Sequence, residues 1–221
     1  MTRPLVVFGL GPLADAACDM LAASGRRPAA FTVDREYLQA DSYAGLPLVA
    51  FEELERRFPP GTHDLLLLIG YRRMRTRAEL FARVKAKGYR LPGLIAATAH
   101  LASGVQLGEN VIVAESAFLG NDARLGDNVL IRPMTYIGHQ SVVGDHTFIA
   151  PRVGIASRCR IGSLCYLGIG ATVIDRVAIG DETLVAAGAV VISDCAAGTQ
   201  MAGIPARKIG EHGETGILIL R

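Results

Sequence analysis

Written in rows of six, residues 123–149 read ARLGDN VLIRPM TYIGHQ SVVGDH TFI, from Ala123 to Ile149. The first place of each row holds a small or β-branched residue, and the third holds an aliphatic residue. The fourth place is glycine in three of the four complete rows. The same register runs without an insertion from Val105 to Cys195. A period of six fits neither a helix nor ordinary hairpins, so it predicts a solenoid of short strands.

The first and third places of the rows are predicted to point inward, since a solenoid buries one stack of side chains along its axis. Cys159 and Cys165 occupy the small-residue column, six residues apart. Their spacing follows the repeat and fits no metal motif, so we predict that they pack in the core. Departures from glycine in the fourth column, as at Arg132 and Ile174, are expected at outward or corner positions.

The first half of the chain alternates strand-like and helix-like segments. An apolar run over 5–8 ends in Gly9-Leu10-Gly11, and a helix is predicted over 12–24, followed by a strand over 28–33. A further strand over 64–69 and a helix over about 75–87 complete a small parallel sheet of Rossmann-like type. This outline matches the dinucleotide fingerprint, although the two glycines also suit a plain strand-to-helix turn.

Ligands of parallel sheets bind at the carboxyl ends of the strands. Three such ends are expected to meet in one small-molecule pocket of the first half. The residues concerned are Gly11, Pro12, Leu13, Asp34, Arg35, Gly70 and Tyr71.

Composition excludes several classes of protein. Of the 221 residues, 50% are hydrophobic and 20% charged, so a disordered chain is excluded. A net charge of +2 with scattered arginines argues against a nucleic-acid surface. The start from Met1 to Pro4 leads directly into a strand, and no apolar stretch is long enough for a bilayer. We therefore expect a cytoplasmic protein that binds no membrane and no metal.

His139 is the leading candidate for chemistry, because it stands at an outward place of its row within Gly138-His139-Gln140. A histidine is the natural general base for an attacking amine or hydroxyl. The plain alternative is a surface histidine.

The glycine turn, the hexapeptide rows and the Gly-His motif together resemble the bacterial nucleotide-sugar N-acetyltransferases and sialic acid O-acetyltransferases, over nearly the whole chain. The resemblance implies an α/β Rossmann-like domain over 1–95 and a left-handed parallel β-helix with coils of eighteen residues over 96–221. It also implies a homotrimer with acetyl-CoA as co-substrate and a nucleotide-linked sugar as acceptor.

The same resemblance implies roles for particular residues. His139 would be the catalytic base, with Gln140 where the family usually has Asp or Glu, and the Ser157 N–H would receive the oxyanion. An amide at Gln140 can orient the imidazole but cannot stabilise the imidazolium by charge, so either another carboxylate substitutes or the base is weaker. Acetyl-CoA would contact Phe148, Ile169, Ala187, Gly168, Gly188, Arg207 and Lys208, although the last two also suit a solvated tail. The sugar would contact Gly11, Pro12, Leu13, Asp34, Arg35 and Tyr71.

The function expected is acetyl transfer to the amino group of a nucleotide-linked deoxyaminosugar by direct attack. Transfer to a sugar or sialic acid hydroxyl is the nearest alternative, and a nucleotide-binding scaffold is a more distant one. A zinc enzyme is disfavoured, because His139 and His146 have no third histidine at matching spacing. An NAD-dependent role for the first half stays open, since Asp34 suits a ribose.

Overall fold

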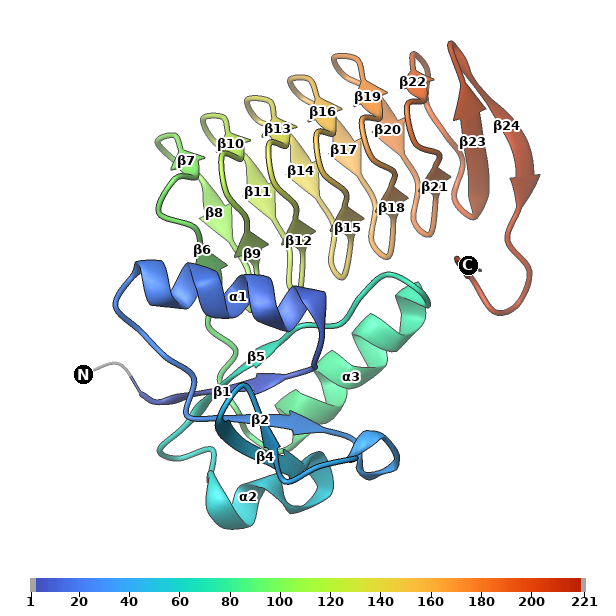
Figure 1. Ribbon diagram of the computed structural model, residues 1–221. Helices are drawn as coiled ribbons and strands as arrows, with labels where there is room; N and C mark the ends of the chain where they lie inside the picture. Colours follow the sequence, from blue (N-terminus) through green and yellow to red (C-terminus); the bar gives the residue numbers. More distant parts are fainter. Residues whose placement is uncertain (1–2, 220–221) are drawn as a thin grey trace.

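The computed structural model describes residues 3–219 and consists of a small α/β domain beside a long β-helix (Figure 1). Residues 1–2 and 220–221 lie outside the described residues. They are the first residues of the first predicted domain and the last residues of the second. No helix among the described residues is long and apolar enough to span a bilayer.

The α/β domain is built on a five-stranded sheet with the order β3-β4-β2-β1-β5. All neighbours pair in parallel except β3 and β4, which form an antiparallel hairpin. The elements are β1 (Leu5–Phe8), α1 (Pro12–Ala23), β2 (Ala30–Val33), the 3₁₀ helix η1 (Arg35–Tyr37), β3 (Ser42–Tyr43), β4 (Leu46–Ala50), the 3₁₀ helix η2 (Phe51–Glu53), α2 (Leu54–Arg57), β5 (Asp64–Leu67) and α3 (Met74–Ala86).

The predicted alternation of strands and helices in this half is confirmed, and the boundaries shift by only a few residues. The β3–β4 hairpin was not predicted. Its strand β3 has two residues, and its turn uses Ala44 and Gly45, both with positive φ as tight hairpins require.

Gly9 allows β1 and the end of β5 to approach closely. Its φ is +120°, and a Cβ at this position would lie 2.5 Å from the carbonyl oxygen of Leu68. The first glycine of the turn is therefore required by packing inside the chain.

The β-helix consists of two-residue strands that recur every six residues and pair in parallel with the strand eighteen residues later, as in Phe118 with Tyr136. These strands form three sheets. Their bounds are β6 (Leu94–Ile95), β7 (His100–Leu101), β8 (Gln106–Leu107), β9 (Ile112–Val113), β10 (Phe118–Leu119), β11 (Arg124–Leu125), β12 (Leu130–Ile131), β13 (Tyr136–Ile137), β14 (Val142–Val143), β15 (Phe148–Ile149), β16 (Gly154–Ile155), β17 (Arg160–Ile161), β18 (Tyr166–Leu167), β19 (Thr172–Val173), β20 (Ala178–Ile179), β21 (Leu184–Val185) and β22 (Val190–Val191).

The predicted β-helix with eighteen-residue coils is thus confirmed. The coils begin earlier than the register read from Val105, because β6 already pairs with β9. At the other end, β23 (Thr199–Gly203) joins β21 and forms an antiparallel hairpin with β24 (Ala206–Glu211).

Both predicted inward columns are buried from the second coil onward. Cys159 and Cys165 are fully buried in the small-residue column, as expected from the repeat. Burial raises the pKa of the Cys165 thiol to about 12, which keeps it protonated and unreactive.

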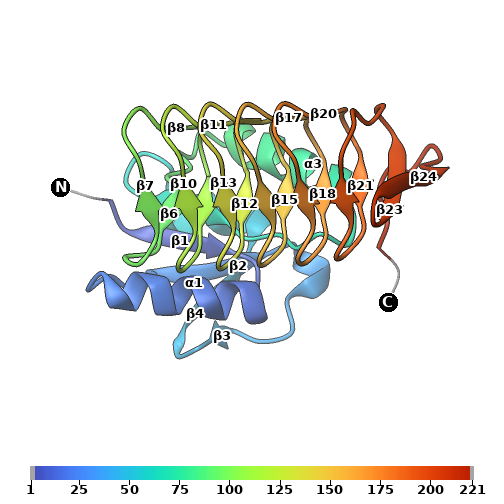
Figure 2. The same ribbon diagram turned by 90° about the horizontal axis from the view of Figure 1, so that it is seen from above.

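The two parts of the molecule share one continuous core. Figure 2 shows α1 lying along the row of coils, and α1 packs against β6. On the other side, the buried Arg77 of α3 donates to the backbone carbonyls of Ile69, Asn128 and His146. The side chain of Asn110 bonds both the N–H and the carbonyl of Leu67, at 2.9 Å each, so it pairs with the edge of β5. These bonds fix the carboxyl end of β5 against the β-helix.

Candidate functional site

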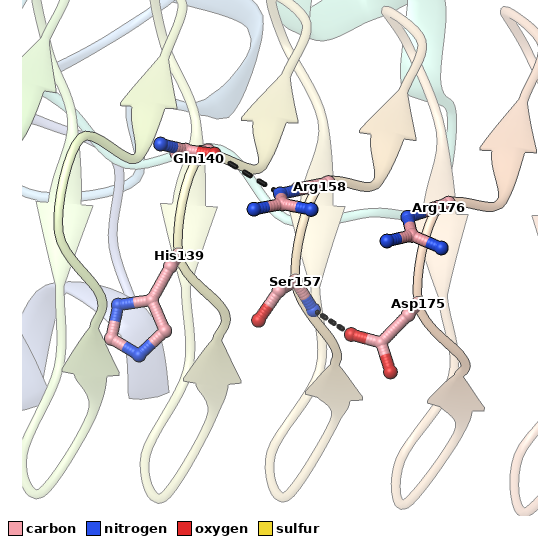
Figure 3. Close-up of a pocket in the computed structure, with 6 residues that line it drawn as sticks. All are labelled: His139, Gln140, Ser157, Arg158, Asp175 and Arg176. Atoms are coloured by element: carbon pink, nitrogen blue, oxygen red, sulfur yellow. Dashed lines mark hydrogen bonds between the residues drawn. The ribbon is translucent and has the colours of Figure 1, made fainter.

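His139 lies in a hollow of about 420 Å³ on one corner of the β-helix (Figure 3). The hollow is lined by residues of three successive coils: His139, Gln140, Ser157, Arg158, Asp175 and Arg176. They follow β13, β16 and β19, which are stacked neighbours in one sheet. The eighteen-residue coil therefore explains how residues distant in sequence come together here.

The corner itself is tight. Gln140, Arg158 and Arg176 all have positive φ, near 60°. A Cβ on Gly138 would lie 2.5 Å from the carbonyl carbon of Ala156 in the next coil. Glycine before His139 thus lets adjacent coils approach, and the left-handed residue after it turns the chain into the next strand.

The turn residues form a ladder of hydrogen bonds in which a side chain accepts from the backbone N–H one coil earlier. Asp175 accepts from Ser157 N–H at 2.8 Å, and His139 Nδ1 accepts from Asn121 N–H at 3.0 Å. The same contact recurs at another corner, where Asp181 accepts from Ser163 N–H at 2.7 Å. Because Nδ1 of His139 uses its lone pair in this bond, a neutral imidazole carries its proton on Nε2.

The residues expected to assist His139 have other partners. The amide oxygen of Gln140 accepts from Arg158 Nε at 3.2 Å, so Gln140 does not orient the imidazole as its place beside His139 suggested. Among residues 3–219, no carboxylate forms a hydrogen bond or ion pair with His139. The Ser157 N–H, expected to receive the oxyanion, donates to Asp175.

A second hollow, of about 630 Å³, lies between the α/β domain and the β-helix. It brings together residues that the sequence assigned to two ligands. Pro12, Leu13 and Tyr71 come from the predicted sugar site, and Phe148, Ile169 and Ala187 come from the predicted acetyl-CoA site. Gly168 and Gly188 adjoin the last two residues in sequence.

One wall of the second hollow, which we call the interdomain hollow, is aromatic. The ring of Tyr71 lies 4.7 Å from that of Phe148 and 5.1 Å from that of Tyr166, measured between centroids. Phe148 is buried beneath them, with Arg77 behind it. The loop after β5 is therefore held against the outer surface of β15 and β18.

The expected convergence of three strand ends is corrected in part. The ends of β1 and β5 meet at the interdomain hollow, but Asp34 and Arg35 after β2 do not line it. Asp34 forms an ion pair with Arg83 of α3 at 2.6 Å, and Arg35 pairs with Glu53. Asp34 is bound to Arg83 and does not line the hollow at the glycine turn, so this geometry does not support the NAD alternative.

The side chain of Tyr43 occupies the glycine turn. Gly11 N–H donates to the hydroxyl of Tyr43 at 3.1 Å, and that hydroxyl donates to Asp15 at 2.6 Å. The sequence did not predict this contact between Tyr43 and Gly11, because Tyr43 belongs to the unpredicted hairpin.

Arg207 and Lys208 lie on β24 and line neither hollow. Arg207 donates to its neighbouring carbonyl at Ala206, and Lys208 forms an ion pair with Glu211. Sequence reasoning overlooked Arg132, which lines the interdomain hollow; its only signal was an arginine where the fourth column usually has Gly or Ala. No group of three or more His, Cys, Asp or Glu side chains within 3–219 is placed to hold a metal ion.

Comparison with known proteins agrees with this architecture. The family model described as bacterial transferase hexapeptide (six repeats) matches residues 122–157, which include His139. A search of curated proteins finds no match.

Among solved structures, PerB from Caulobacter crescentus in complex with CoA and GDP-perosamine is 27% identical, with a TM-score of 0.85 over 94% of this chain and 97% of that one. Histidine-to-asparagine and histidine-to-alanine variants of that perosamine N-acetyltransferase also match. The acetyltransferase domain of PglB from Neisseria gonorrhoeae in complex with acetyl coenzyme A is 25% identical, with a TM-score of 0.85 over 95% of this chain and 100% of that one.

WeeI from Acinetobacter baumannii, at 20% identity and a TM-score of 0.83 over 94% of this chain and 100% of that one, shows a likeness of fold alone. The chain shares the six-residue repeat with the bacterial transferase hexapeptide model, and it shares its two-part architecture over nearly its whole length with the acetyltransferases PerB and PglB.

Proposed function

We propose that this chain transfers the acetyl group of acetyl-CoA to the amino group of a nucleotide-linked aminosugar. The observation that carries the proposal is the match over 94% of the chain to an N-acetyltransferase with CoA and GDP-perosamine bound. In this proposal the α/β domain, residues 1–95, holds the nucleotide-linked sugar and residues 96–221 hold acetyl-CoA.

The interdomain hollow supports this division. Its volume of about 630 Å³ is in the range of small-molecule sites, and its lining is mostly apolar. Pro12, Leu13 and Tyr71 would contact the acceptor, while Ile169 and Ala187 would lie along the pantetheine of acetyl-CoA. Gly188 would let that chain run close to the backbone, because a Cβ there would meet no atom within 4 Å. A Cβ on Gly168 would lie 2.5 Å from the backbone nitrogen of Ala187, so that glycine serves the packing of adjacent coils instead.

The two hollows share no lining residue. His139 follows β13, whereas Phe148 and Tyr166 of the interdomain hollow lie on β15 and β18, which belong to a different sheet of the β-helix. A homotrimer would resolve this separation by placing the His139 corner of one copy beside the interdomain hollow of the next. We propose that assembly as the active form.

In the proposed reaction, the acceptor amine attacks the thioester carbon of acetyl-CoA. A C–N bond forms, the carbonyl oxygen becomes an oxyanion, and the C–S bond then breaks to release CoA. His139 takes the proton that the amine loses, a role typically worth 10²–10⁴-fold in rate. The Ser157 N–H would stabilise the oxyanion once Asp175 has turned away.

The hydrogen bond from Asn121 N–H places a condition on His139. For Nε2 to accept a proton it must hold a free lone pair, and the ring proton must then reside on Nδ1. That arrangement is incompatible with an N–H donor at Nδ1. We therefore propose that acceptor binding turns the imidazole away from Asn121.

The proposal is tested by measuring acetyl-CoA-dependent thiol release with UDP-, dTDP- and GDP-linked aminosugars, and with sialic acid as an acceptor that has hydroxyl groups but no free amine. We expect release with at least one aminosugar. His139→Asn should lower kcat by roughly 100-fold or more while leaving CoA affinity within about twofold. His100→Asn, a change on the exposed surface of β7, is the matched control and should retain full activity.

Two results would remove the proposal. One is thiol release that needs no amino group on the acceptor, which would assign O-acetylation. The other is full turnover by the His139→Asn enzyme.

A further inference from the structure

Arg132 occupies a fourth-column position, where most rows have Gly or Ala, at one corner of the β-helix. It follows β12, and the equivalent residues of the neighbouring coils are Ala114 and Ala150. The side chain at this position is a methyl group in those two coils, whereas in this coil it is a guanidinium group that lines the interdomain hollow. Of the described residues that line this hollow, Arg132 alone is charged.

The Arg132 side chain is half-buried and has no polar partner of its own. Its guanidinium forms no hydrogen bond or ion pair with any residue from 3 to 219. Burial lowers its pKa, and the carboxylate of Glu115 offsets this only from beyond ion-pair distance. A half-buried charge without a partner costs free energy, so the free protein gains nothing from it.

Arg77 provides the contrast within the same molecule. It is also buried near Phe148, and its guanidinium is bonded to three backbone carbonyls. Arg77 therefore serves the packing of the two domains. Arg132 faces the interdomain hollow on the open side of the same wall, and no residue from 3 to 219 supplies an acceptor to it there.

We infer that Arg132 binds an oxyanion of the acyl acceptor. The inference rests on the proposed function for the identity of that acceptor. The guanidinium fork suits both the diphosphate of a nucleotide-linked sugar and a carboxylate on the sugar itself. The hollow also contains Ile169 and Ala187 of the proposed acetyl-CoA site, but these follow β18 and β21, two and three coils beyond β12. Arg132 interacts electrostatically with Tyr71, which follows the carboxyl end of β5, and we therefore assign it to the acceptor rather than to CoA.

The experiment is titration calorimetry on the full chain with UDP, dTDP, GDP, N-acetylneuraminate and CoA as separate probes. We expect wild-type protein to bind at least one nucleoside diphosphate or the carboxylate sugar. Arg132→Met should weaken that binding at least tenfold and reduce its salt dependence, while Arg132→Lys should restore part of it. CoA affinity should stay within twofold, as should all affinities of Arg160→Met, an exposed arginine on β17.

Thermal unfolding separates a binding role from a structural one. Because Arg132 has no partner in the free protein, Arg132→Met should melt at the same temperature as wild type or higher. A melting temperature lowered along with every affinity would assign Arg132 to packing and overturn the inference. So would unchanged binding in the variant, a loss confined to CoA, or a wild-type protein that binds none of the four acceptor probes.

These binding measurements do not depend on turnover. Arg132-dependent binding of UDP, dTDP or GDP without any acetyl transfer would contradict the proposed function and leave the inference intact. Acetyl transfer to an aminosugar with an acceptor KM that Arg132→Met leaves unchanged would support the proposed function and contradict the inference.

Discussion

At the scale of single residues, His139 is both a candidate base and a member of the turn ladder. Other members are Asp175 and Asp181, which accept backbone N–H bonds in the same way. The sequence motif located His139 but did not show what its Nδ1 contacts, because the donor is a backbone group eighteen residues earlier. The kinetics of His139→Asn distinguish a catalytic from a structural role for this histidine.

Asp175→Ala tests the role of the Ser157 N–H directly. If this N–H receives the oxyanion, Asp175 competes for it, and its removal should raise kcat by up to about tenfold, or ~1.4 kcal/mol. Asp181→Ala is the matched control, because it deletes the same ladder contact, to Ser163, outside the His139 hollow. Steady-state thiol release measures both. A fall in kcat for Asp175→Ala alone would instead make the carboxylate part of the reaction.

At the scale of elements, the six-residue register determines which positions tolerate a side chain. Gly138 and Gly154 belong to adjacent coils but to different places of the row: Gly138 follows β13 at the corner, whereas Gly154 is the first residue of strand β16 and pairs with Tyr136. A Cβ on Gly138 would lie within 2.6 Å of backbone atoms of Ala156 and Ser157, whereas a Cβ on Gly154 would have nothing within 4 Å. The register places the two glycines differently, and the coil geometry explains why only the fourth-place glycine is required.

Gly138→Ala should therefore destabilise the β-helix by about 1–3 kcal/mol, as overpacking typically does. Gly154→Ala should be neutral or stabilise by about 0.4–1 kcal/mol, because it restricts the unfolded chain without a clash. Urea unfolding followed by far-ultraviolet circular dichroism gives both values. Equal midpoints for the two variants would show that adjacent coils separate easily, contrary to the contacts at this corner.

At the scale of the whole molecule, the sequence predicts what is local or periodic. The β-helix follows from its columns, and the strands and helices of the first half follow from their apolar runs and glycines. Contacts between segments distant in sequence were not predictable: Tyr43 on the glycine turn, Arg83 on Asp34, and Arg132 across from Tyr71. The first two depend on how distant segments pack within the α/β domain, and the third depends on how that domain sits on the β-helix; no periodicity encodes either.

His146 lies at that junction between the two domains. Its ring meets Phe81 of α3 edge-on at 5.4 Å, and its Nδ1 accepts from the side-chain amide of Asn128 at 3.1 Å. Burial lowers the pKa of His146, and Arg77 adds to this, while Asp145 and Asp127 act in the opposite direction. The folded protein thus holds this imidazole neutral, with its Nδ1 lone pair engaged.

A lowered pKa in the folded state has a defined consequence for stability. The ordinary pKa of histidine is 6.5, and above this pH His146 is neutral in both the folded and the unfolded protein. As the pH falls through 6.5, the unfolded chain takes up a proton at His146, whereas the folded protein, with its lowered pKa, does not yet do so. The free energy of unfolding should therefore fall between pH 7.5 and pH 5.5. His146→Gln should make this loss smaller without abolishing it, since burial lowers the pKa of His212 as well. Urea midpoints at the two pH values measure the effect, with His100→Gln as the exposed control, and parallel losses in wild type and His146→Gln would show that the domain junction does not resist protonation.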